Sequence, residues 1–95
     1  MPSYEDMIVE ALTGSHDPDG VAPKDIYAWM QTHYPVQSNF RPSASQALQK
    51  AYKKGRFEKG NNGKYRVNPN YSGVGSSVRT FLLEYMNDVL HLISQ

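Results

Sequence analysis

The side chains best suited to bind a ligand are lysines and arginines gathered in one stretch of this 95-residue chain. Residues 41–66 hold eight bases against the single acid Glu58, whereas residues 1–40 hold one base, Lys24, against six acids. The formal net charge of +1 therefore hides a strong separation of charge along the chain. Such asymmetry favours a polyanion as the partner of the basic stretch, although a charged stretch can also be a solvated surface.

Ten side chains of the basic stretch are candidate contacts to phosphate groups. The charged ones would neutralise phosphates, and the neutral ones could add hydrogen bonds to phosphates or base edges. Because lysine dominates and mainly contacts the backbone, we expect binding that is largely independent of base sequence. The candidates are Lys50, Lys53, Lys54, Arg56, Lys59, Lys64, Arg66, Gln49, Ser45 and Arg41.

Other kinds of chemistry have little support. The chain has no cysteine, so a thiolate zinc site and a disulfide framework are both excluded. The histidines at 16, 33 and 91 lack the companion motifs of a nucleophilic triad. Asp17-Pro18-Asp19-Gly20 has the residue types that begin a calcium loop, but the glutamate of such a loop would fall on Ala28, so a turn is predicted. We therefore expect no enzymatic activity, cofactor, metal or small-molecule substrate. We also expect no membrane partner, because no apolar run approaches the ~20 residues of a membrane-spanning helix.

Three helices are predicted to precede the basic stretch or to run into it. Ser3 can cap a helix over 4–13, and Pro23 fits the first turn of a second helix. After a loop over 35–41, Pro42 can open a third helix. The residues at helical spacing that should be buried are Tyr4, Met7, Ile8, Ala11 and Leu12, then Ile26, Trp29, Met30 and a partly buried His33, then Ala44, Ala47, Leu48, Ala51 and Tyr52.

A basic hairpin should follow a helix stop at Gly55. The segments 56–59 and 64–67 alternate in polarity around Gly60-Asn61-Asn62-Gly63, which is a hairpin signal. Three helices with a β-ribbon attached form a winged helix, an α+β variant of the helix-turn-helix. The third helix would lie along the major groove of duplex DNA while the hairpin grips the adjacent backbone. The predicted inward residues of the hairpin are Phe57, Tyr65 and Val67, and the outward ones are Arg56, Lys59, Lys64 and Arg66.

The rest of the chain is predicted to carry an extra C-terminal α-helix. We expect a winged-helix domain over 1–69, a polar and glycine-rich linker over 70–76, and an amphipathic helix over 77–95. The apolar stripe of this helix covers only about two heptads, too few for a self-sufficient coiled coil. It should therefore dock on its own domain or form a homodimer. The residues predicted to mediate self-association are Val78, Phe81, Leu82, Tyr85, Val89 and Leu92.

Three short motifs follow one another in an order typical of one protein family. Pro2-Ser3-Tyr4-Glu5-Asp6-Met7-Ile8 is similar to a Pro-x-Tyr-x-x-Met-Ile start, and Thr32-His33-Tyr34 to a Ser-His-Tyr helix ending. Gly63-Lys64-Tyr65-Arg66-Val67 is similar to a closing Gly-x-Phe-basic-Leu strand. Over roughly residues 2–68 the chain thus resembles the globular domain of linker histones. The resemblance implies a chromatin protein in the nucleus, with nucleosomal or linker DNA as its ligand.

Two surfaces depart from the pattern of that family. Where the resemblance implies bases on the third helix, this chain has Ser45, Gln49 and Lys50. A second DNA surface around the second helix would here hold Lys24, Asp25 and Gln31. The hairpin loop is also shorter, and an apolar segment stands where the family has a lysine-rich tail. The alternative function is therefore a protein-interaction or dimerisation module of a chromatin-associated protein.

Overall fold

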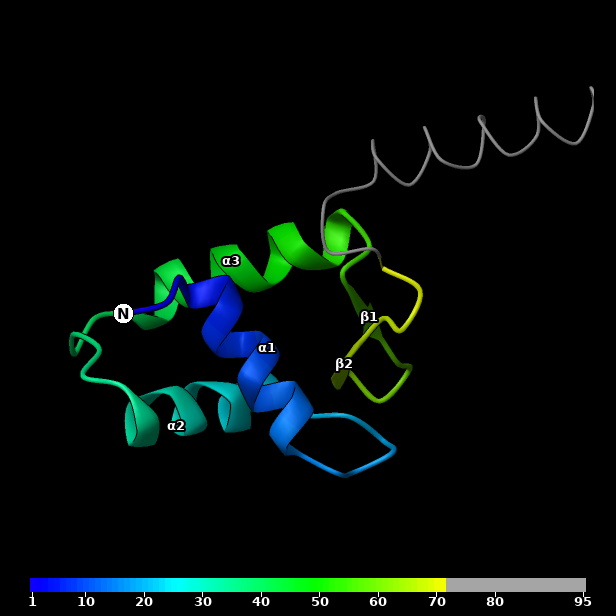
Figure 1. Cartoon of the computed structure of the whole chain (residues 1–95), viewed down its shortest axis with the longest axis horizontal. Coiled ribbons are helices and arrows are strands. Elements are labelled where there is room, and N and C mark those ends of the chain that lie inside the picture. The colour runs from blue at the N-terminus through cyan, green and yellow to red at the C-terminus, as the bar shows by residue number, and fades with distance from the viewer. Residues whose placement is uncertain (72–95) are drawn as a thin grey trace, which may run out of the picture.

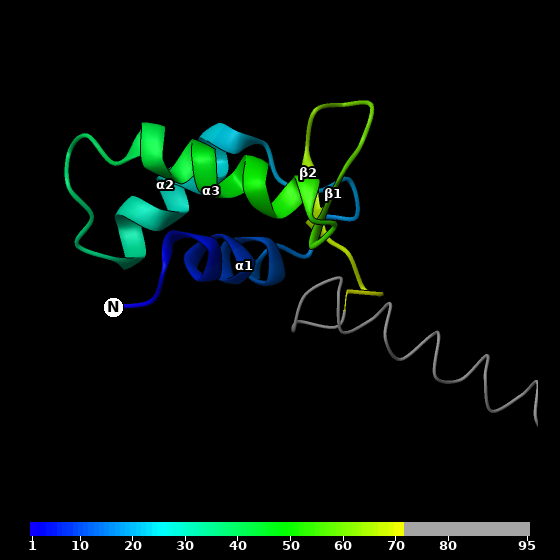
Figure 2. The same cartoon turned by 90° about the horizontal axis from the view of Figure 1, so that it is seen from above.

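The computed structural model describes residues 1–71 as three α-helices followed by a β-hairpin. Figure 1 shows α1 running from one of the other two helices to the other, and Figure 2 shows it in a layer of its own against both. The hairpin lies beyond the C-terminal end of α3 (Figure 1). This arrangement confirms the α+β winged-helix prediction. The elements are α1 (Tyr4–Gly14), α2 (Pro23–His33), α3 (Arg41–Lys53), β1 (Phe57–Lys59) and β2 (Tyr65–Val67).

The helix ends have the local causes that the sequence suggests. The Ser3 hydroxyl accepts a hydrogen bond from the Asp6 backbone N–H at 3.1 Å, so it caps α1. α2 and α3 each begin with a proline in the first turn, where a missing N–H costs nothing. Gly55 has φ +89° just beyond α3, which is the left-handed conformation that stops helices. The helices therefore fall within a residue or two of their predicted bounds.

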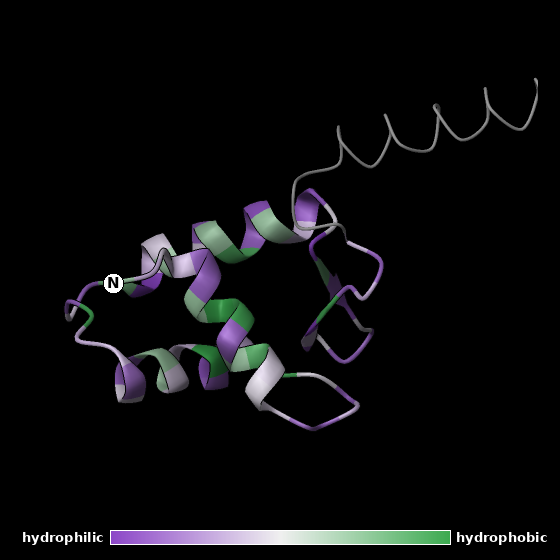
Figure 3. Cartoon of the chain, viewed as in Figure 1, coloured by the Kyte–Doolittle hydropathy of each residue, from purple (hydrophilic) through white to green (hydrophobic). Residues whose placement is uncertain are grey.

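The core lies where the three helices and the hairpin meet. Figure 3 shows hydrophobic residues gathered where the helices approach one another. Because α1 packs on both other helices, its apolar face supplies a third of the buried hydrophobic set. The set consists of Met7, Ile8, Ala11, Leu12, Ile26, Met30, Phe40, Ala44, Leu48, Ala51, Phe57 and Tyr65.

Tyr4, Trp29 and Ala47, which are predicted to be buried, are half-buried against the core. Three other residues differ more clearly from the prediction. Tyr52 is 41% exposed, because the buried face of α3 is formed by Ala44, Leu48 and Ala51 and Tyr52 lies at the edge of that face. His33 is exposed, since it is the last residue of α2 and its ring lies flat on the outside of Trp29. Phe40, placed in a loop by the sequence, is buried between the rings of Tyr4 and Tyr27, with centroid distances of 6.4 and 6.2 Å.

The hairpin is docked onto the helical core by the backbone as well as by side chains. β1 and β2 are antiparallel, with Phe57 opposite Val67 and Lys59 opposite Tyr65. Val21, just before α2, forms an isolated bridge with Tyr65, in which each N–H donates to the other residue's carbonyl at 2.8 and 2.9 Å. No pattern in the sequence predicts this third backbone segment. The wing, defined as residues 57–67, is therefore fixed to the segment that precedes α2.

The linker over 70–76 is only partly included and the helix over 77–95 lies outside the described residues 1–71. Those predictions, and the domain boundary at residue 69, stay predictions. No helix in the described range is long and apolar enough to cross a membrane.

Candidate nucleic-acid interface

The outward side of α3 and the wing meet around the side chain of Tyr65. Its ring packs edge-on against Tyr52 of α3, with centroids 6.0 Å apart and ring planes at 86°. The Tyr65 hydroxyl accepts a hydrogen bond from the Gln49 side-chain amide at 3.1 Å, and the Lys59 ammonium lies 5.6 Å from the centre of the same ring. These four residues define what we call the α3–wing notch. A buried tyrosine thus joins the third helix to the first strand of the wing.

Most of the predicted contact residues lie around this notch or along the exposed side of α3. Gln49 and Lys53 project from the side of α3 opposite its buried alanines and leucine, because residues one and two positions away from a buried residue turn away from it. Ser45 and Lys64 are half-buried. Arg41 lies at the other end of α3, about 18 Å from Lys53 at 1.5 Å per residue, so it is not part of the notch. The exposed members of the predicted set are Arg41, Gln49, Lys50, Lys53, Lys54, Lys59 and Arg66.

Two predicted contacts, Lys54 and Arg56, are already paired with acids of α1. The Lys54 ammonium lies 2.7 Å from one oxygen of Glu5, and the Arg56 guanidinium donates to the other oxygen. Arg56 also lies 3.7 Å from Asp6, and its side chain is only 23% exposed. The prediction that Arg56 faces largely outward is therefore wrong. The acids at the start of α1 do more than complement its helix dipole, since they neutralise part of the basic stretch.

The ionisation of Glu5 reflects these two partners. Partial burial by itself would raise the pKa of the Glu5 carboxyl, but hydrogen bonds and charge attraction from Lys54 and Arg56 outweigh it and lower this pKa below 4.5. A group with a lowered folded-state pKa stabilises the fold above its unfolded-state pKa and stops doing so as the pH falls through the folded value. The Glu5 pairs should therefore stabilise the domain at neutral pH and not in acid.

Glu5→Gln is expected to lower the free energy of unfolding by about 1 kcal/mol at pH 7, the upper range for ion pairs open to solvent. The difference from wild type should shrink as the pH falls below 4.5 and vanish once Glu5 is protonated. Urea unfolding at several pH values measures it. Asp25→Asn is the control, because Asp25 has no ion-pair partner within residues 1–71. A loss of unfolding free energy in Glu5→Gln that is the same at every pH would show that the charge of Glu5 does not stabilise the domain.

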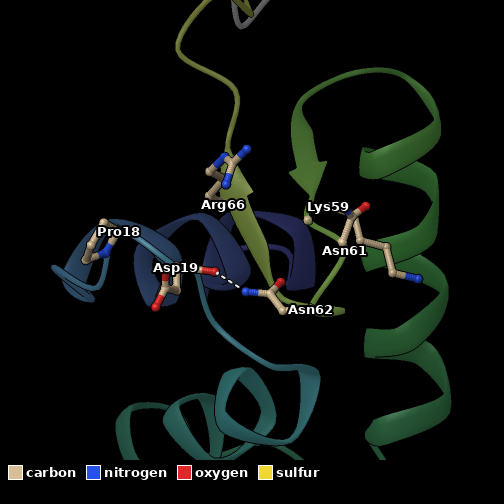
Figure 4. Close-up of a pocket in the computed structure, with 7 residues that line it drawn as sticks. Pro18, Asp19, Lys59, Asn61, Asn62 and Arg66 are labelled. Atoms are coloured by element: carbon tan, nitrogen blue, oxygen red, sulfur yellow. Dashed lines mark hydrogen bonds between the residues drawn. The ribbon is translucent and has the colours of Figure 1, made fainter.

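An open hollow of about 530 Å³ lies between the wing turn and the α1–α2 loop (Figure 4). The Asn62 side-chain amide donates to the Asp19 carbonyl at 3.1 Å and holds the two together. The basic side chains here are accompanied by an acid, so the hollow has mixed charge. It is lined by Pro18, Asp19, Lys59, Gly60, Asn61, Asn62 and Arg66. Within the described residues no cluster of three metal-ligating side chains occurs.

The surface of α2 differs in character from that of α3. The His33 ring stacks on Trp29 with centroids 3.9 Å apart, and Trp29 and Tyr34 pack against the core while remaining half-buried. The Tyr34 hydroxyl donates to Glu10 at 2.7 Å, and this hydrogen bond raises the pKa of Tyr34 above 10.0. Lys24 is the single base that α2 contributes. A second basic surface on this side is therefore absent from the described residues.

A helix-turn-helix core, a docked β-hairpin and a basic side formed by α3 and the wing define a winged-helix protein. Residues 1–68 match the model of the linker histone H1 and H5 family, so the chain belongs to that family. It is 32% identical over 56 residues to "Histone H1" of Ascobolus immersus, an alignment that covers 59% of this chain and 26% of that protein. The match thus spans about a quarter of the relative's length. The motif-based prediction of a linker histone globular domain is confirmed. Linker histones are structural chromatin proteins and not enzymes, so the chain belongs to a family of that kind.

The residues predicted to mediate self-association, from Val78 to Leu92, all lie outside the described residues. A homodimer through this segment therefore stays a prediction from the sequence.

Proposed function

We propose that this chain binds duplex DNA, free or in nucleosomes within the nucleus, through α3 and the wing. The observation that supports the proposal is a set of bases on α3 and the wing with no carboxylate partner within residues 1–71. These are Lys50, Lys53, Lys59 and Lys64, together with Arg41 at the other end of α3. Tyr65 joins the helix to the hairpin, and it brings Lys59 of the wing beside the exposed side of α3, whereas Lys64 lies on the other face of the hairpin.

The binding mode follows from the shapes of the elements. α3 has the length and the exposed polar side to lie in a major groove. The wing lies beside the C-terminal end of α3 (Figure 1), where it would meet the flanking backbone. Lysine ammonium groups contact phosphates without reading bases, so binding should be largely independent of sequence. Arg66 joins this set more readily than Arg56, because its contact with Glu58 is 4.0 Å long and both side chains are exposed.

The salt dependence of DNA binding tests this proposal. Contacts to about four or five phosphates should make the logarithm of the association constant fall with the logarithm of salt concentration at a slope of about −4. Fluorescence anisotropy of a labelled duplex, titrated at several salt concentrations, measures the slope. Weak binding that does not respond to salt would rule out a phosphate-based interface on this surface.

A further inference from the structure

Tyr52 is a large aromatic side chain that the fold leaves in contact with solvent. Among the large hydrophobic residues described, only Tyr52, at 41%, and the terminal Met1 are exposed. Most of the aromatic residues of this domain are buried or packed against the core. Burial among residues 1–71 therefore does not explain the presence of a tyrosine at this position.

The exposed ring is also held in place. Tyr52 packs edge-on against Tyr65, which is only 2% exposed. The hydroxyl of Tyr65 in turn accepts a hydrogen bond from Gln49, which lies about one turn before Tyr52 on α3. An aromatic side chain has few rotatable bonds, and contact with a buried ring restricts them further. The next residue, Lys53, is an exposed base, and Lys59 stands over the other tyrosine ring. The ring is thus presented in the α3–wing notch, to which Lys59 also contributes, and it is next in sequence to the exposed Lys53.

We propose that Tyr52 packs against the apolar C–H surface of a nucleotide, either a deoxyribose or the methyl group of a thymine. The inference rests on the proposed DNA binding and adds a contact of a different kind. A neutral ring at this place contributes by removing apolar surface from water, which releases no counterions. The affinity for DNA therefore has one component that added salt does not weaken, and Tyr52 supplies it.

The test compares three variants of the full chain, Tyr52→Ala, Tyr52→Phe and Lys53→Ala, across a range of salt concentrations. Tyr52→Ala should bind a mixed-sequence duplex about tenfold more weakly at every salt concentration, with an unchanged slope. Tyr52→Phe keeps the ring and should stay within about twofold of wild type. Lys53→Ala should instead make the slope shallower by about one.

A duplex with deoxyuridine in place of thymidine separates the two possible contacts. If the Tyr52→Ala loss disappears on that duplex, the ring contacts a thymine methyl group, and if the loss persists, it contacts the sugar. Thermal unfolding of Tyr52→Ala confirms that the exposed substitution leaves the domain folded. Binding by Tyr52→Ala equal to wild type, or a loss that appears only in the slope, overturns the proposal. A salt-independent wild type would instead contradict the proposed function itself.

Discussion

Replacing both Lys50 and Lys53 with glutamate is expected to weaken duplex binding on the order of 100-fold near 0.1 M salt. The change removes two phosphate contacts from α3 and places two carboxylates against the DNA backbone. The slope of the logarithm of the association constant against the logarithm of salt concentration should become shallower, from about −4 to about −2. Lys54 is less suitable for this test because Glu5 already holds its ammonium group. Anisotropy titrations of the variant and wild type on the same duplex give both quantities.

The control is Lys24→Glu, which reverses a charge on the exposed surface of α2 and not on α3 or the wing. It should lower the affinity only a few-fold, through the change in net charge. All three lysines are exposed, so unfolding free energies should stay within about 0.5 kcal/mol of wild type. If Lys24→Glu is as damaging per charge as the α3 variant, net charge and not a defined surface governs binding. Full affinity in the α3 variant would move the interface elsewhere.

Gly20→Ala is expected to destabilise the domain by about 3 kcal/mol or more, which lowers the melting temperature by roughly 15 °C. Gly20 has φ +92°, a conformation that costs alanine free energy. A Cβ atom at this position would also lie 2.7 Å from the Tyr65 carbonyl oxygen, closer than such atoms can approach. The chain must then move away from Tyr65 and lose the bridge between that residue and Val21. Calorimetry or thermal circular dichroism measures the loss.

Gly55→Ala provides a matched comparison for the Gly20 variant. Gly55 has almost the same dihedral angle, φ +89°, but a Cβ atom there would meet nothing within 4 Å. This variant should cost only the backbone strain, about 1 kcal/mol. The additional loss of unfolding free energy in Gly20→Ala, compared with Gly55→Ala, then measures the effect of the close contact between residue 20 and the Tyr65 carbonyl of the wing. Equal losses in the two variants would show that the wing tolerates displacement from the α1–α2 loop.

Local patterns were sufficient to predict the elements of this fold. The Ser3 cap, the prolines that open α2 and α3, and the positive φ at Gly55 depend on interactions within a few residues, so they can be read along the chain. Alternation around a Gly/Asn turn likewise predicted the hairpin and its buried Phe57 and Tyr65. The order of three short motifs then indicated the family that the comparison confirms.

Contacts between distant residues account for what the sequence could not show. Glu5 reaches Arg56 across 51 positions, and no local pattern indicates that an α1 acid neutralises this part of the basic stretch. The exposure of Tyr52 has a similar origin, because the wing's Tyr65 fills the core beside α3 and leaves Tyr52 at its margin. Phe40 is buried from within a loop because rings on two different helices enclose it. The ion pair, the exposed tyrosine and the buried phenylalanine all depend on how the helices and the wing pack together, which no local sequence pattern specifies.

The bridge between Val21 and Tyr65 has a consequence for the thermodynamics of recognition. A free hairpin arm would lose conformational entropy on docking against a ligand, and each residue ordered would oppose binding by about 1 kcal/mol or more. Here the wing is anchored by reciprocal backbone hydrogen bonds and by the Asn62 contact to Asp19. The backbone that carries its lysines is therefore preorganised before any partner arrives. The heat capacity and entropy of association should resemble those of rigid docking, without the signature of coupled folding.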